Sequence, residues 1–211
     1  MTPAGLVADH GAALRAKLLP DPPPLPLAPP RGDYDLNPAV RPATAPPLVP
    51  AAVMIPIVLR PEPTVLFTQR SESLTRHAGQ VSFPGGCADP EDVTLVATAM
   101  RELREETGIA SDYVSVAGFL DAYETVTGYA VLPVVGLLRE GFTLALDARE
   151  VDTVFEVPLA FLLDRKSRQE DRLQWKGGIR RVYAFQYETR YIWGATAAIL
   201  VDFADRLHDA S

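Results

Sequence analysis

Three glutamates in one short segment are the residues of this chain best suited to chemistry. Glu102, Glu105 and Glu106 are spaced three and four positions apart, which brings their side chains together on one side of an α-helix. Like charges at this spacing destabilise a helix, so the cluster calls for an explanation. A solvent-exposed acidic face, partly screened by Arg101 and Arg104, is one explanation. A divalent cation is the other, because magnesium takes oxygen ligands, often one or two carboxylates together with substrate phosphates.

Two elements must position these carboxylates, a glycine turn and a helix. Residues 83–86 read Phe-Pro-Gly-Gly, and the sequence after the acidic loop that follows predicts a helix ending at Gly108. Gly85 and Gly86 permit tight backbone geometry and the close approach of a ligand. At about 100° per residue, the buried face of the helix is expected to hold the apolar side chains of Val93, Val96, Met100 and Leu103.

The predicted helix resembles the second half of the signature of the Nudix hydrolases, which reads Arg-Glu-apolar-x-Glu-Glu-x-Gly-apolar. Residues 101–109 match it throughout, as Arg-Glu-Leu-Arg-Glu-Glu-Thr-Gly-Ile. The first half departs from the signature. Gly86 and Arg101 are 101 − 86 = 15 positions apart, one more than in the general pattern, and Asp92 stands where the family has Glu. The departure concerns the role of Asp92 and leaves the three glutamates intact.

This resemblance implies a metal-dependent hydrolase with Mg²⁺ or Mn²⁺ as its cofactor. It makes Glu102 and Glu106 metal ligands, and it makes Glu105 either a ligand or a base that acts through water. In the wider family a backbone carbonyl at the glycine turn also holds metal, which implies this role for Gly86. Structural roles fall to Arg101, Gly85 and Gly108.

The residues upstream of the glycine turn resemble one branch of this family, the coenzyme A pyrophosphatases. Residues 68–86 follow the pattern Thr-Gln-Arg-Ser-x-x-Leu-x-x-His-x-Gly-Gln-Val-x-Phe-Pro-Gly-Gly. Residues 126–136 and 191–197 resemble the same branch, and the resemblance extends over roughly residues 49–205. It implies coenzyme A or a derivative as the substrate, split into 4′-phosphopantetheine and 3′,5′-ADP.

Five residues of the upstream loop are the candidate substrate contacts: Arg70, Arg76, His77, Gly79 and Gln80. Arginine pairs with phosphate through charge-assisted, often bidentate hydrogen bonds, and coenzyme A carries a 3′-phosphate as well as its diphosphate. His77 is expected to order the loop, since magnesium prefers oxygen ligands. The branch usually has Arg at the position of Thr75, so Arg76 would have to make that contact through a shifted loop. Without the resemblance, these side chains read equally well as a solvated surface loop.

A distant carboxylate is the general base in some Nudix enzymes. Glu150 is the candidate here, with Asp152 and Glu156 as alternatives. A surface acid at a strand edge is an equally good interpretation of Glu150. Arg101 is expected to orient Glu105 rather than to touch the substrate.

The order of the predicted elements favours an α/β protein. Apolar stretches predict strands at residues 52–59, 64–69, 113–123, 129–138 and 153–157. Pro56 indicates a bulge or a sheet edge in the first of them. A hairpin is predicted around Gly177-Gly178, and an amphipathic helix is predicted to run from Trp193 to Leu207. The resemblance implies a Nudix-type α/β/α sandwich with a mixed sheet.

The chain of 211 residues is expected to form one domain with an N-terminal extension. Residues 1–47 would form the extension, with a short helix at 11–19 and then a proline-rich segment that cannot be helix or central strand. That segment reads as polyproline II packed along the surface, as a linker, or as a docking site for a proline-binding partner. Residues 48–211 would form the Nudix hydrolase domain.

The net charge of −7 argues against broad binding to nucleic acid or to anionic membranes, so the expected partner is a small nucleotide substrate. The single cysteine, Cys87, excludes an internal disulfide and fits a reducing compartment. With no membrane span and no secretory signal in the sequence, the cytoplasm is the expected location. A homodimer is compatible with the sequence, but no feature requires one.

Two alternative functions remain open. Another Nudix substrate, such as ADP-ribose or a dinucleotide, would keep the chemistry and change only the contacts of the upstream loop. A non-catalytic nucleotide-binding module would be expected to have lost carboxylates from the cluster, and all three are present.

Overall fold

A mixed β-sheet between two helical layers forms the centre of the protein. The computed structural model describes residues 11–42, 47–75, 77–175 and 178–208. The sheet contains β1 (Arg31–Gly32), β2 (Val49–Val58), β3 (Thr64–Arg70), β4 (Val81–Ser82), β5 (Gly85–Cys87), β6 (Val114–Phe119), β7 (Tyr123–Glu124), β8 (Tyr129–Leu138) and β9 (Val151–Pro158). The helices are α2 (Ala12–Arg15), α3 (Leu95–Thr107), α4 (Leu159–Leu163) and α5 (Ala195–His208), with 3-10 turns at Pro38–Val40 and Ser111–Tyr113. A second, antiparallel sheet contains β10 (Arg168–Trp175), β11 (Gly178–Tyr187) and β12 (Arg190–Trp193).

The strands β2 and β8 run through the middle of the larger sheet. They pair in parallel along their whole length, whereas β2 pairs with β3 and β5 in antiparallel fashion. β5 lies opposite residues 51–53 of β2, and β3 lies opposite residues 57 and 58. Pro56 lies between these two partners, and its pairing with Gly136 of β8 continues without a shift in register. No bulge occurs at Pro56, but the proline falls where one side of β2 pairs with neither β5 nor β3, so the predicted sheet edge is present locally.

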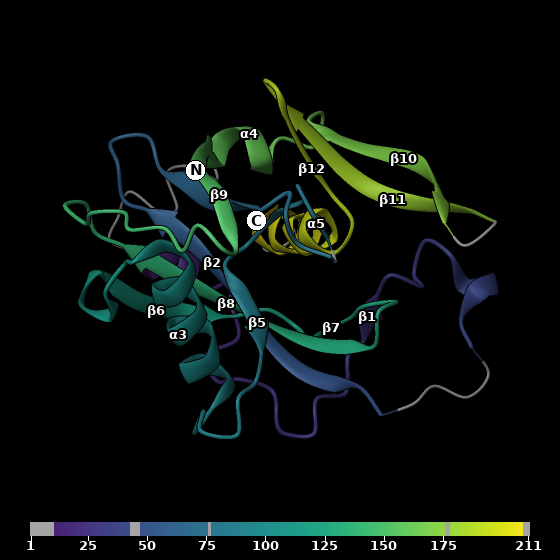
Figure 1. Ribbon diagram of the computed structural model, residues 1–211, viewed down its shortest axis with the longest axis horizontal. Coiled ribbons are helices and arrows are strands. Elements are labelled where there is room, and N and C mark those ends of the chain that lie inside the picture. Colours follow the sequence, from purple (N-terminus) through teal and green to yellow (C-terminus); the bar gives the residue numbers. More distant parts are fainter. Residues whose placement is uncertain (1–10, 43–46, 76, 176–177, 209–211) are drawn as a thin grey trace.

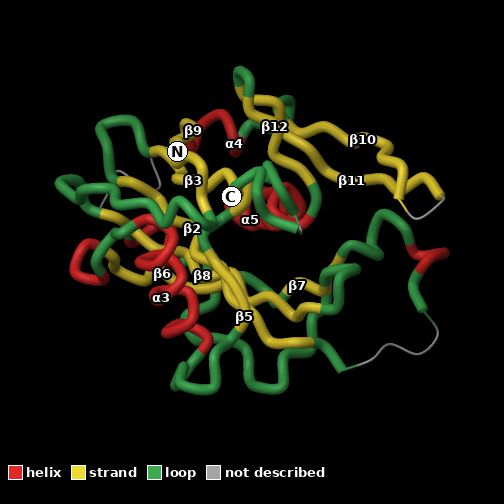
Figure 2. The backbone as a smooth tube through the Cα atoms, in the orientation of Figure 1, coloured by secondary structure: helices red, strands yellow, loops and turns green. Residues whose placement is uncertain are grey.

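Alternating side chains along β2 separate two hydrophobic cores. Ala52 and Met54 lie in one core with Leu103 of α3. Ile55 lies in the other core with Phe203 of α5. The two long helices accordingly lie on opposite sides of β2 and β8 (Figures 1 and 2). The predicted α/β/α sandwich with a mixed sheet is confirmed.

Helix α3 carries the glutamate cluster. It begins after Thr94, whose hydroxyl accepts the Ala97 amide hydrogen bond at 3.1 Å, and it ends, as predicted, at Gly108, where φ is 77°. Val93 was placed on the buried face by its spacing, but it is 92% exposed. That prediction was wrong because Val93 precedes the N-cap and lies outside the helix. Three of the apolar residues expected on the inner face do pack there, namely Val96, Met100 and Leu103.

The N-terminal segment packs onto the sheet. Leu14 of α2 and the nearby Leu18 are buried in the core on the α5 side, and Leu19 forms an isolated bridge with Phe119. β1 adds a parallel pairing to β7. In Figure 1 the hairpin of β10 and β11 projects above β1 and β7, with the segment that follows β1 between them. None of the described helices is long and apolar enough to cross a membrane.

Candidate active site

Glu106 is the most deeply buried member of the cluster, with 3% of its surface exposed. The Thr68 hydroxyl donates to one carboxylate oxygen at 3.0 Å, and the Gly85 amide donates to the other at 3.3 Å. Burial raises the pKa of Glu106 to about 7, although these two hydrogen bonds and the charge of Arg70 lower it. A solvated acidic face is therefore ruled out for Glu106, because its carboxylate is buried and accepts two hydrogen bonds from the protein.

Glu102 lies against the glycine turn. A Cβ atom added to Gly86 would lie 2.5 Å from the Oε1 of Glu102. The Glu102 carboxylate therefore occupies space that is free only because residue 86 is glycine. Burial raises the pKa of Glu102, the contact with Arg101 lowers it, and the charges of Glu105 and Glu150 raise it further. The Glu102 side chain is 14% exposed. The charge of Glu150, in the loop before β9, thus acts on a glutamate of α3.

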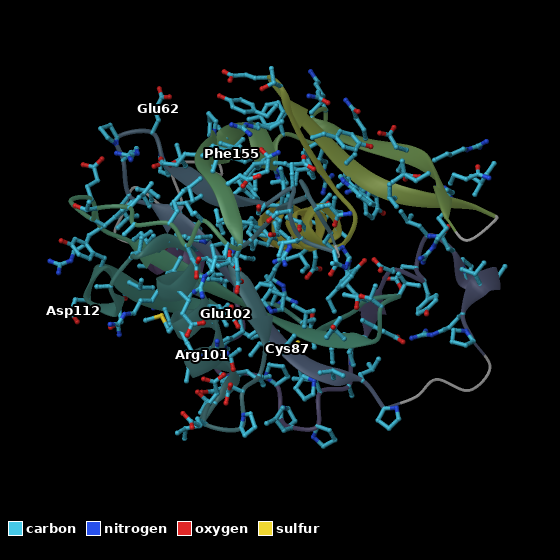
Figure 3. The ribbon with its side chains drawn as sticks, in the orientation of Figure 1. Glu62, Cys87, Arg101, Glu102, Asp112 and Phe155 are labelled. Atoms are coloured by element: carbon cyan, nitrogen blue, oxygen red, sulfur yellow. The ribbon has the colours of Figure 1, made fainter. Side chains whose placement is uncertain are left out.

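Arg101 joins Glu102 to the loop that precedes α3 (Figure 3). Its guanidinium donates to both oxygens of Asp92, through Nε at 3.1 Å and Nη2 at 2.9 Å. Its Nη1 donates to Glu102 at 2.8 Å and to Glu105 at 2.9 Å, and its Nη2 also donates to the Cys87 carbonyl at 3.1 Å. The predicted contact with Glu105 is present, but the same guanidinium also holds Glu102 and the loop that precedes the helix.

Asp92, which replaces the first signature glutamate, faces Arg101. Its carboxylate also accepts the Thr98 hydroxyl and the Asp89 amide, each at 2.9 Å. The hydrogen bonds from Arg101 are the main reason why the pKa of Asp92 lies well below its ordinary range. Asp92 therefore anchors the loop to α3. Sequence reasoning could not assign this role, because the motif departs from the family pattern at this position.

The two remaining acids of the candidate set are more exposed. The Glu105 side chain is 58% exposed, and its contact within the described chain is with Arg101. Glu150 is exposed just before β9, near enough for its charge to act on Glu102. Of the alternatives to Glu150, Asp152 accepts the Glu72 amide at 3.0 Å. Glu156 is bound by Arg60 at 2.7 Å, which leaves Glu150 as the acid of the three that is close to the cluster and uncommitted among the described residues.

The upstream loop closes on itself beside Glu106. The Arg70 amide donates to the Gln80 carbonyl at 2.9 Å, and the Gly79 amide donates to the Arg70 carbonyl at 3.2 Å. His77 Nδ1 lies 2.8 Å from the Gln80 side-chain oxygen, so its contact is within the loop. The Nε of Arg70 is buried and has no hydrogen-bond partner among the described residues. Arg76, the other predicted phosphate contact, lies outside the described residues.

A cavity of about 560 Å³ begins at this loop and the glycine turn. Arg70, His77, Gln80, Gly85 and Gly86 line this end of it. The far end, on the side of β1 and β11 (Figure 1), is walled by residues 31–33 and 35–37 of the N-terminal segment and by residues 180–183 of β11. Sequence reasoning missed both walls, because nothing in the local pattern of either segment indicates that it lines the same cavity as the glycine turn.

The residues at the glycine turn fit a divalent cation in their chemistry. Glu102 and Glu106 offer carboxylate oxygens and Gly86 a carbonyl oxygen, the hard donors that Mg²⁺ and Mn²⁺ accept. The space beside Glu102, which any side chain at position 86 would fill, supports the fit. Within the described part of the chain, no group of three Asp, Glu, His or Cys side chains is arranged to hold a metal ion. Glu102 and Glu105 are instead hydrogen-bonded to Arg101.

Comparison with known proteins identifies the class. Residues 48–175 match the NUDIX domain family, and the chain therefore belongs to the Nudix hydrolases. It is 46% identical over 159 residues to the uncharacterized Nudix hydrolase NudL of Yersinia enterocolitica, covering 75% of this chain and 81% of that protein. The NudL of Photorhabdus laumondii is 44% identical over 157 residues, covering 74% of this chain and 84% of the relative.

Solved Nudix structures resemble parts of the chain. The MutT protein of Methanosarcina mazei is 25% identical, with a TM-score of 0.45 over 57% of this chain and 84% of that one. The Ap4A hydrolase of C. elegans is 22% identical, with a TM-score of 0.44 over 53% of this chain and 81% of that one. The family match, independently of these structures, makes the protein a Nudix pyrophosphatase, an enzyme class that generally uses divalent metals.

Proposed function

We propose that this Nudix hydrolase cleaves the diphosphate of coenzyme A, or of a derivative, into 4′-phosphopantetheine and 3′,5′-ADP. One water is consumed: its oxygen bonds to one phosphorus, the bridging P–O bond breaks, and the diphosphate becomes two phosphate monoesters. The observation that carries the proposal is the cavity that leads away from the glycine turn. A volume of about 560 Å³ is in the range of sites that enclose one small ligand.

The upstream loop supports this substrate. Arg70 lines the cavity with a buried Nε that lacks a partner, and its charge acts on Glu106. An arginine in this state can donate a hydrogen bond to a phosphate oxygen without first breaking an ion pair. The loop sequence around Arg70 also resembles the coenzyme A pyrophosphatase branch.

Each acidic residue has a proposed part in the reaction. A bound Mg²⁺ or Mn²⁺ would neutralise charge on the diphosphate and lower the pKa of a water molecule. Glu102 and Glu106, with the Gly86 carbonyl, would hold this ion, and Glu105 would be a further ligand or a base that acts through water. Arg101 orients Glu102 and Glu105 through the hydrogen bonds already described. Glu150 accepts the proton that the attacking water loses, since it is the nearby acid without another partner among the described residues.

The setting of the enzyme is also part of the proposal. A reducing compartment fits the single, exposed Cys87, and we place the enzyme in the cytoplasm. His77, Gly79 and Gln80 are proposed to shape the substrate loop, since their contacts lie within it.

Product chromatography tests the proposal. The protein is incubated with coenzyme A and Mg²⁺ or Mn²⁺, and in parallel with ADP-ribose and a dinucleotide. Metal-dependent formation of 3′,5′-ADP is expected. Glu106→Gln is expected to lower its rate at least about a hundredfold, equivalent to roughly 2.7 kcal/mol of transition-state stabilisation.

Glu62→Gln is the matched control, because Glu62 is exposed in the turn after β2 and lies away from Glu102 (Figure 3). It should keep the wild-type rate. Turnover of ADP-ribose or the dinucleotide without turnover of coenzyme A would refute the substrate and retain the glutamate cluster. A Glu106→Gln variant that is as active as the control would refute the assignment of the site.

A further inference from the structure

Arg180 is a buried arginine at the far end of the cavity, 8% exposed. Its Nε is buried and contacts no hydrogen-bond acceptor. Among the described side chains, only Arg70 Nε is in the same state, and both arginines line the same cavity, one at each end. A buried charged group without a hydrogen-bonded partner is costly, so two of them facing one cavity call for a common explanation.

The N-terminal segment holds Arg180 in place. Asn37 brackets the next residue of β11: its Nδ2 donates to the Arg181 carbonyl at 2.9 Å, and its Oδ1 accepts the Arg181 amide at 2.9 Å. The Cζ of Arg180 lies 6.0 Å from the centre of the Tyr34 ring. These contacts hold the backbone next to Arg180 and place the Tyr34 ring beside its guanidinium before any ligand arrives, and such pre-ordering lowers the cost of binding a ligand.

The acids near Arg180 are committed elsewhere. Asp33 accepts the Tyr123 hydroxyl at 2.9 Å and the Val126 amide at 2.8 Å. Asp35 accepts the Gly32 amide at 3.1 Å. Neither acid forms an ion pair with Arg180 in the described part of the chain, although the charge of Arg180 lowers the pKa of Asp33, which burial raises.

The other arginines at this end of the cavity have acidic partners. Arg31 pairs with Asp202 at 3.2 Å, and Arg181 pairs with Glu170. Among the described arginines of this wall, Arg180 is therefore the one with a buried N–H donor that has no acceptor. It lies beyond the residues that match the family, 48–175, and the wall opposite it, residues 31–33 and 35–37, precedes them.

We propose that Arg180 forms a second anion subsite, which binds a phosphate monoester on the nucleotide moiety while the diphosphate lies at the glycine turn. The subsite rests on the proposed function, in which the monoester is the 3′-phosphate of coenzyme A. It defines the substrate class as nucleoside diphosphates that carry a further phosphate at a distance from the scissile bond. Arg180 is then a specificity-determining residue.

Paired substrates test the subsite. The ratio of kcat/KM for coenzyme A to that for 3′-dephospho-coenzyme A is measured for the wild type, Arg180→Gln, Arg180→Lys and the control Arg172→Gln. Arg172 is exposed on the same hairpin, so the control makes the same chemical change outside the cavity. A hydrogen bond between charged groups predicts a wild-type ratio of about 10 to 100, a ratio near 1 in Arg180→Gln and an unchanged ratio in the control. Arg180→Lys, which keeps the charge, should give an intermediate ratio.

A binding measurement separates failure of the subsite from failure of the proposed substrate. Calorimetry compares adenosine 3′,5′-bisphosphate with AMP on the same variants, without turnover. Tighter binding of the bisphosphate that is lost in Arg180→Gln supports the subsite even if coenzyme A is not hydrolysed. Equal binding of both nucleotides by the wild type, or an equal loss of both in a variant whose Tm matches the wild type, overturns it.

Discussion

Replacing the adjacent glycines Gly85 and Gly86 by alanine should have different effects: Gly85→Ala should lower the stability of the fold, and Gly86→Ala should lower the catalytic rate. The Cβ of Gly85→Ala would lie 2.5 Å from the Ala52 carbonyl oxygen and 2.7 Å from the Cα of Val53, both backbone atoms of β2. The Cβ of Gly86→Ala would lie 2.5 Å from the Oε1 of Glu102, the mobile end of a side chain. The first clash moves the sheet, whereas the second moves only a carboxylate.

The size of each effect follows from these distances. Ordinary van der Waals contact starts at 3.4 Å, so the Glu102 carboxylate must retreat by 3.4 − 2.5 = 0.9 Å in Gly86→Ala. A displacement of about 1 Å in a catalytic group costs roughly a hundredfold in rate. Overpacking against backbone costs about 1–3 kcal/mol, which corresponds to a fall in Tm of roughly 2–12 °C for a chain of this size.

Differential scanning calorimetry and steady-state kinetics with coenzyme A and Mg²⁺ check both expectations. Gly86→Ala should keep the wild-type Tm within about 2 °C and lose about a hundredfold in kcat. Gly85→Ala should show the larger fall in Tm. Full activity in Gly86→Ala would refute the argument that the space beside Glu102 belongs to the catalytic site. A fall in Tm as large as that of Gly85→Ala would show that position 86 acts through the fold.

Substitution of three charged residues of the site, Glu106, Glu150 and Arg101, should give three further measurable effects. In metal-free protein, the raised pKa of Glu106, about 7 against an ordinary 4.5, means that the folded state holds a proton that the unfolded chain has lost between these values. The wild type should therefore lose about 3 kcal/mol of unfolding free energy as the pH rises from about 4.5 to 7, and Glu106→Gln should not, as measured by urea unfolding in EDTA. Glu150→Gln should lower kcat by about 10²–10⁴-fold, whereas Asp152→Asn should change kcat less than about twofold. Arg101→Lys loses the paired hydrogen bonds to Asp92, so its Tm should fall by roughly 4–8 °C, and an unchanged Tm would contradict the anchoring role.

Local sequence patterns were sufficient to predict the centre of the protein. The strands that became β2, β3 and β8 and the helix α3 each bury a face that their own periodicity marks. The proximity of Glu102 to Glu106 follows from helical spacing alone, and Gly108 ends the helix with the positive φ that glycine adopts readily.

Features that depend on contacts between distant segments could not be predicted in this way. The burial of Glu106 depends on Thr68 and the Gly85 amide, which come from β3 and β5. The error at Val93 has a local cause. The helical spacing of apolar residues extends to Val93, but the helix itself begins only after Thr94. The bracket between Asn37 and Arg181 joins residues 144 positions apart, and neither residue belongs to a motif.

The structure thus divides the enzyme into a local part and a long-range part. The proposed chemical groups Glu102, Glu105 and Glu106 lie on one helix of the family domain, where helical spacing suffices to bring them together, and Gly86 and Glu150 come to them from β5 and from the loop before β9. The far wall of the cavity is formed by chain segments before and after the matched residues 48–175, which are joined by the hydrogen bonds between Asn37 and Arg181. Changes in that wall can alter which nucleotide is accepted while the hydrolytic site stays the same, and on this physical ground we expect Arg180 to affect the choice of substrate and the glutamates to affect its turnover.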